Sequence, residues 1–232
     1  MELILDGIRT AWHLLVSLDR EVLSITFLSL KVSGLATLIS LFIGTLGGTA
    51  IALAEFPGKR LVVSVVNTSM GLPPVVVGLF VTIMLWRNGP LSYLDILYTP
   101  TAMVIAQTII AAPIVMGITI ASIQNLPPNL RLQILALGAT RRQMVLILVK
   151  EARLPLLAAI MAGFGGVISE VGASIMVGGN IKGYTRVLTT ATVMETSMGN
   201  FDKAIALGII LLGLCFAINY ILTLVQQRER PR

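Results

Sequence analysis

Residues 23–53 read LSITFLSLKVSGLATLISLFIGTLGGTAIAL, and within this run only Lys31 carries a charge. A helix crosses the hydrocarbon core of a bilayer with about 20 apolar residues, and this run is longer than that. It lacks the period-2 alternation of a strand in a membrane barrel. The run therefore predicts a transmembrane helix, with Lys31 either reaching the interface or contacting an anion in a pathway.

Four further apolar runs of comparable length follow along the chain. They are residues 61–86, 101–123, 154–177 and 204–225. Composition agrees, because 56% of all residues are hydrophobic and 12% are charged, about half the charged share of a soluble domain. We predict an all-α integral membrane protein with a domain at residues 23–225 and about five transmembrane helices. Six is the alternative, with the extra span in the N-terminal segment.

The two ends of the chain differ from these runs. Residues 1–22 mix charged with apolar residues and lack the basic start, apolar centre and cleavage site of a signal peptide, so we predict an amphipathic surface helix there. The loops fix the orientation, since ten Lys and Arg residues fall on one side of the membrane and six on the other. The richer side holds residues 226–232, which we predict to be a cytoplasmic tail. This topology explains the net charge of +6 without nucleic acid.

The second run carries two prolines, and the first carries a pair of glycines. Pro73 and Pro74 lie in the middle of the second run, where they remove two backbone donors. This pair predicts either a kink used for packing or an opening that faces a substrate pathway. Gly44 and Gly48 form a G-x-x-x-G pair in the first run, and they predict close helix packing.

The fourth run contains a carboxylate, and a glycine-rich segment follows it. Ser169, Glu170 and Gly172 lie within the run, where a charged group must face a cavity or a partner. The segment after it continues with Gly178, Gly179, Asn180, Lys182 and Arg186. Its two cations predict either a passage for an anion or a helix end with solvated charges.

Residues 130–155 read LRLQILALGATRRQMVLILVKEARLP, and this segment is more polar than the runs that flank it. Its periodicity predicts a short helix, a turn at Gly138 and a second helix, on the cytoplasmic side. A helix pair that projects from the membrane is suited to a groove on a soluble protein. Arg141 and Arg142 alternatively bind lipid headgroups.

These segments together resemble the type I ABC importer permeases of the molybdate, sulfate and tungstate group. The similarity rests on ALGAT (136–140), on Leu154-Pro155, on SEVGASIMVGGN (169–180), on SLKVSGLATLISLFIGTLGG (29–48) and on GLPPVVVGL (71–79). The blocks SEVGA, MVGGNIKGYTRVLTT (176–190) and ETSMGNF (195–201) are most similar to tungstate permeases.

The resemblance implies a type I permease fold whose cytoplasmic coupling segment, about residues 126–150, enters a groove on an ATPase subunit. The residues implied in that contact are Ala136, Leu137, Gly138, Ala139, Thr140, Arg141 and Arg142. The residues implied in the gate or pathway are Pro73, Pro74, Ser169, Glu170, Gly172, Gly178, Gly179, Asn180, Lys182 and Arg186. The sequence departs from the family pattern at Leu132-Gln133-Ile134, and Leu154-Pro155 lies four residues later than usual.

The resemblance also implies partners: a second copy of this chain, a pair of cytoplasmic ABC ATPase subunits that hold ATP and Mg²⁺, and an extracytoplasmic oxyanion-binding protein. No G-x-x-x-x-G-K-[ST] motif, nucleophile–base pair or Cys/His cluster occurs, so we expect no bound nucleotide, catalysis or metal in this chain. The expected location is the inner membrane of a bacterium or archaeon, and the expected cargo is tungstate. Molybdate or sulfate is the alternative cargo. An ion-coupled transporter or a membrane-embedded enzyme is the alternative class.

Overall fold

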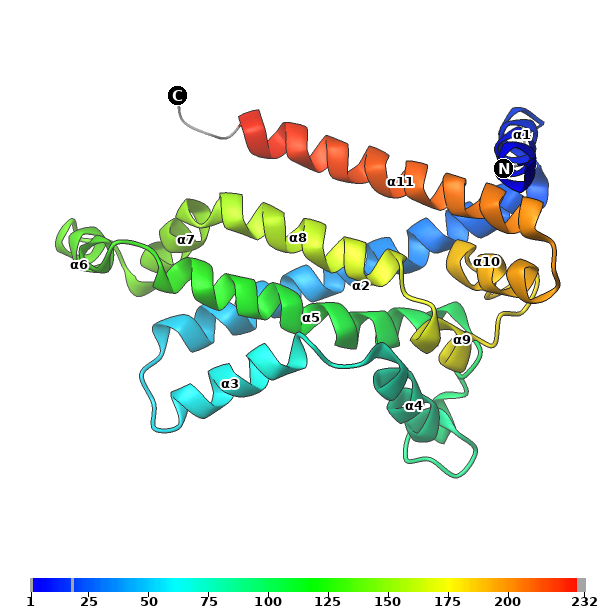
Figure 1. Cartoon of the computed structure of the whole chain (residues 1–232). Helices are drawn as coiled ribbons and strands as arrows, with labels where there is room; N and C mark the ends of the chain where they lie inside the picture. Colours follow the sequence, from blue (N-terminus) through cyan, green and yellow to red (C-terminus); the bar gives the residue numbers. More distant parts are fainter. Residues whose placement is uncertain (1, 18, 229–232) are drawn as a thin grey trace.

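The computed structural model describes residues 2–17 and 19–228, and these residues form helices and turns without any strand (Figure 1). Three helices are each long and apolar enough to cross a membrane: α2 (Arg20–Leu53), α5 (Pro100–Gln124) and α11 (Phe201–Arg228). Two bent pairs meet the same test, which gives up to five spans in the described part of the chain. The predicted all-α membrane fold class is confirmed.

The bent pairs occupy two of the predicted apolar runs. An interruption of the second run was predicted from Pro73 and Pro74, whereas the fourth run was predicted as one helix that includes Glu170. Helices α3 (Lys59–Ser69) and α4 (Pro74–Leu85) meet at an angle of 99°. Helices α8 (Arg153–Ile168) and α9 (Gly172–Gly178) meet at 60°. The first bend follows from proline chemistry, because Pro73 is extended and Pro74 opens a new helix at its first position, where a missing N–H costs nothing.

Small residues hold the centre of the bundle together. Helices α2 and α5 lie side by side, and a Cβ added at Gly44 would lie 2.7 Å from Val115 Cβ. At Gly48 the corresponding distance to Thr119 Cβ is also 2.7 Å. The close packing predicted from the G-x-x-x-G pair is therefore confirmed.

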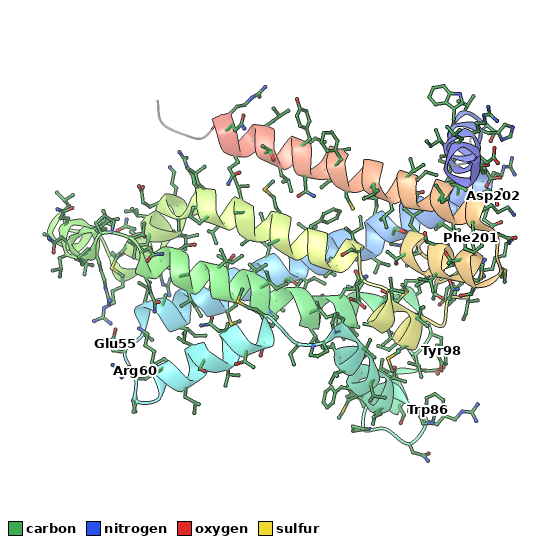
Figure 2. The ribbon with its side chains drawn as sticks, viewed as in Figure 1. Glu55, Arg60, Trp86, Tyr98, Phe201 and Asp202 are labelled. Atoms are coloured by element: carbon green, nitrogen blue, oxygen red, sulfur yellow. The ribbon has the colours of Figure 1, made fainter. Side chains whose placement is uncertain are left out.

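The remaining helices divide between two ends of the bundle. Helices α6 (Pro128–Ala136) and α7 (Arg141–Glu151) extend from one end, which also carries the loop of Glu55 and Arg60 (Figures 1 and 2). Helices α1 (Glu2–Val16), α10 (Leu188–Ser197) and the short η1 (Ser92–Leu94) lie toward the other end. The sequence did not predict α10. The loops richer in Lys and Arg therefore lie at one end of the bundle, and the loops with fewer of these residues lie at the other end.

Candidate functional site

The coupling segment contains a sharp turn between α6 and α7. Gly138 has a φ of +85°, in the left-handed region, and its N–H donates to Leu135 O at 3.0 Å. The Ala139 N–H donates to Ile134 O at 3.3 Å, so the carbonyl groups at the end of α6 are satisfied. A Cβ at Gly138 would meet no atom within 4 Å. Glycine is therefore required here by backbone conformation and not by crowding.

The second helix of the segment starts with a capping box. The Gln143 N–H donates to Thr140 Oγ1 at 3.3 Å, and the Thr140 N–H donates to Gln143 Oε1 at 2.8 Å. Behind the turn, Ile134, Met144 and Leu148 form a buried apolar cluster. The cap and the cluster fix the α6–α7 pair as a rigid unit.

The outer surface of this unit exposes several leucines among polar side chains. Leu137, at the tip of the turn, is 88% exposed, Leu146 is 69% exposed and Leu132 is 66% exposed. Leu137, Gly138, Ala139 and Leu146 line a shallow depression on this surface. Exposed apolar patches often occur at interaction surfaces, and this one lies on a segment that projects beyond the membrane spans.

Ala136, Arg141 and Arg142 are also exposed. The two arginines occupy the first turn of α7, where the helix dipole disfavours positive charge. Their exposure leaves both guanidinium groups accessible to an anionic surface outside the chain.

Glu170 lies in the break between α8 and α9, not inside a helix as predicted. Its Oε1 accepts a hydrogen bond from the Ala173 N–H at 2.9 Å, so the carboxylate caps α9. Its backbone oxygen accepts from Thr189 Oγ1 at 3.0 Å. Ser169 is exposed, and its hydroxyl donates to Gly165 O at 2.7 Å. Neither side chain is therefore a free group in the bundle.

The two interrupted spans meet each other. Helix α4, which begins after Pro73 and includes Pro74, packs against α9. A Cβ at Gly172 would lie 2.6 Å from Val75 Cγ2, and one at Gly78 would lie 2.7 Å from Ala173 Cα. Gly172 thus contacts the helix that Pro74 begins, although the two residues were predicted separately from distant segments.

The chain leaves α9 through a strained turn. Gly179 has a φ of +71° and Asn180 a φ of +50°. A Cβ at Gly178 would lie 2.8 Å from Met103 Sδ, and one at Gly179 would lie 2.9 Å from Tyr98 Cδ1. Tyr98 also donates its N–H to Val177 O at 2.9 Å. This turn therefore packs against α5 and the loop before it.

Both predicted cations of this loop are paired with one carboxylate. Lys182 Nζ lies 2.8 Å from Glu21 Oε2, and Arg186 Nη1 lies 3.7 Å from Glu21 Oε1. Glu21 belongs to the first turn of α2. The pairing lowers the net positive charge that an approaching anion would meet.

The predicted site residues thus fall into three groups: the α6–α7 turn, the α4–α9 contact and the loop after α9. Sequence reasoning missed Glu21 and Tyr98. For Glu21 a signal was available, because Asp19 and Glu21 are two acidic residues directly before an apolar run. For Tyr98 nothing in the neighbouring sequence indicated a role. Within residues 2–17 and 19–228, no group of three or more His, Cys, Asp or Glu side chains is placed to hold a metal.

A bundle of apolar spans with interrupted helices and a projecting apolar helix pair defines a membrane transport component. The chain belongs to the family described as "Binding-protein-dependent transport system inner membrane component", which it matches over residues 33–231. Proteins of this family are multi-pass components of the inner membrane.

The comparisons with individual proteins agree with the family. The chain is 42% identical to "Tungstate uptake system permease protein TupB" of Peptoclostridium acidaminophilum, over 98% of this chain and 100% of that protein. It is also 42% identical to "Probable anion ABC transporter permease protein" of Haloferax volcanii, over 85% and 88% of the two chains. A solved structure, "Crystal structure of an amino acid ABC transporter with histidines", shares the fold with a TM-score of 0.67 at 21% identity, over 92% of this chain and 96% of that one.

Proposed function

We propose that this chain is the permease subunit of an ABC importer for the oxyanion tungstate. Support comes from the relative named as a tungstate permease, which aligns along its whole length, and from the relative named for an anion. The match reaches residues 169–190, the block that contains Glu170 and the loop after α9. Molybdate and sulfate are the competing cargoes.

The observation that carries the mechanism is the α6–α7 turn. It presents Leu137 at 88% exposure on a rigid helix pair at one end of the bundle. In the proposed importer this turn enters a groove on a separate cytoplasmic ATPase subunit, which binds ATP and Mg²⁺ and hydrolyses the nucleotide. The permease itself binds no cofactor and catalyses no reaction. The C-terminus then lies in the cytoplasm with α6 and α7.

Transport requires a pathway that opens alternately to the two sides. We assign the gate to the packed unit that α4 and α9 form, including Pro73, Pro74 and Glu170. Two copies of the chain form the complete unit, with the pathway between them. An extracytoplasmic binding protein delivers the oxyanion to the end that carries α9 and α10.

Reconstitution tests this proposal. Proteoliposomes that contain the permease, its ATPase subunit and its binding protein should take up tungstate only with ATP, and unlabelled tungstate should compete better than molybdate or sulfate. Proteoliposomes with the permease alone should take up none, and the permease alone should bind no nucleotide. Uptake driven by an ion gradient without the ATPase subunit would instead support an ion-coupled transporter.

A further inference from the structure

Helix α1 crosses the end of the bundle opposite α6 and α7. Figure 1 views α1 nearly along its axis, while α11 runs across the view. The two helices contact each other closely, since a Cβ at Gly7 would collide with the side chain of Ile205 and Ala11 is buried. The exposed side of α1 carries Leu5, Ile8, Trp12 and Val16. An apolar stripe with a tryptophan is typical of a helix that lies in the membrane–water interface.

A cavity of about 480 Å³ lies among α1, the start of α2, α10 and the start of α11. One part of its wall is apolar and includes Leu14, Val22, Ile25 and Leu207. These residues belong to, or pack against, the buried cluster that joins α2, α10 and α11. The cavity therefore has an apolar wall that lies beside the interfacial helix.

The wall also carries six charged side chains, three of each sign. The carboxylates are those of Asp19, Glu21 and Glu195, and the cations are those of Lys182, Arg186 and Lys203. Their formal charges cancel, so the cavity gives no net attraction to a simple anion. A ligand with one positive and one negative group satisfies such a wall better.

Several of these groups have hydrogen-bonding capacity left over. Lys203 forms no ion pair with any residue in the described part of the chain, and the guanidinium nitrogens of Arg186 make only long contacts, to Glu21 Oε1 at 3.7 Å and to Asn180 O at 3.5 Å. Asp19 uses Oδ1 to accept from the N–H groups of Glu21 and Val22, at 2.9 and 3.0 Å. Unused donors on the cations and unused acceptors on the carboxylates thus coexist in one cavity.

We propose that this cavity binds the headgroup of a zwitterionic phospholipid. The phosphate accepts hydrogen bonds from Lys203 and Arg186, and the ammonium group donates to Asp19 and Glu195. The acyl chains continue along the apolar wall toward the stripe on α1. The proposed lipid site does not depend on the identity of the cargo.

Lipid competition on the wild-type protein is the first test. The detergent-purified full chain, stripped of lipid, is titrated with dioleoyl phosphatidylethanolamine and with dioleoyl phosphatidylglycerol, and bound lipid is counted by native mass spectrometry. We expect the zwitterionic lipid to bind at least fivefold more tightly. Equal binding of both lipids, or a preference for phosphatidylglycerol, would overturn the proposal. This comparison needs no variant, so it remains decisive if a substitution prevents folding.

Two substitutions distinguish a zwitterionic site from an anionic one. Lys203→Gln and Glu195→Gln should each weaken phosphatidylethanolamine binding about five- to tenfold. That factor is the contribution to affinity that one partly solvated, charge-assisted hydrogen bond makes. At an anion site the second substitution would strengthen lipid binding, and that result contradicts the assignment. Lys31→Gln and Glu55→Gln remove one charge of each sign from exposed positions outside the cavity. These two controls should leave the lipid count unchanged.

Discussion

Truncation of Leu137 tests the proposed contact with the ATPase subunit most directly. The side chain is 88% exposed, so Leu137→Ala removes almost no contact inside the permease. Its effect on the stability of the isolated chain should stay within about 0.5 kcal/mol. If a groove on the ATPase buries the side chain, the lost methylene groups are worth about 2 kcal/mol. That loss corresponds to a roughly 30-fold weaker complex.

The measurement is a titration of the purified ATPase subunit against the immobilised permease in detergent. Leu212→Ala is the matched control, because Leu212 is 71% exposed but lies on the spanning helix α11. The control should bind the ATPase as the wild type does. Equal dissociation constants for both variants would refute the assignment of the turn as the docking surface. A melting temperature lowered only in Leu137→Ala would refute the claim that the residue is free of internal contacts.

Three further predictions concern glycines and the Glu170 cap. Gly138→Val and Gly58→Val both force a side chain into a left-handed conformation with open space around it, at about 1–2 kcal/mol, yet only the former should lower ATP-dependent uptake in proteoliposomes. Glu170→Gln weakens the cap of α9 and should destabilise the chain by up to about 1 kcal/mol, seen as a lower melting temperature. Gly78→Val drives a Cβ against the backbone of α9 and should cost about 1–3 kcal/mol in the same assay. Gly208→Val, with nothing nearby, should melt at a temperature closer to that of the wild type.

The features that the sequence predicted well are those set by local chemistry. The first apolar run required a membrane helix because only lipid suits so many consecutive apolar residues. The turn at Gly138 was predictable because periodicity stops and restarts on either side of one glycine. The structure has that turn with a φ of +85° and a capping box at Thr140. Both signals lie within a few residues of the structure that they specify.

The features that were missed depend on residues far apart in the chain. Glu21 and Lys182 are separated by most of the sequence, so nothing in the sequence pairs one with the other. Helix α10 was missed because its threonine-rich run resembles a loop, although Leu188, Thr189 and Thr190 are buried. Burial against α2 and α11 stabilises it, and such burial is not visible in composition.

The two bends also explain each other. A broken helix at membrane depth exposes backbone groups that lipid cannot satisfy, so each break needs cover from protein. Two hydrogen bonds satisfy polar groups at the break after Ile168. The Glu170 carboxylate accepts from the Ala173 N–H, and the Glu170 carbonyl oxygen accepts from the Thr189 hydroxyl of α10. Helix α4 then lies against α9 at Gly172 and covers it. Neither short helix spans a membrane alone, and each packs closely on the other. We therefore expect α4 and α9 to move as one body in any change that opens a pathway, and a disulfide between them should leave ATP-dependent uptake intact.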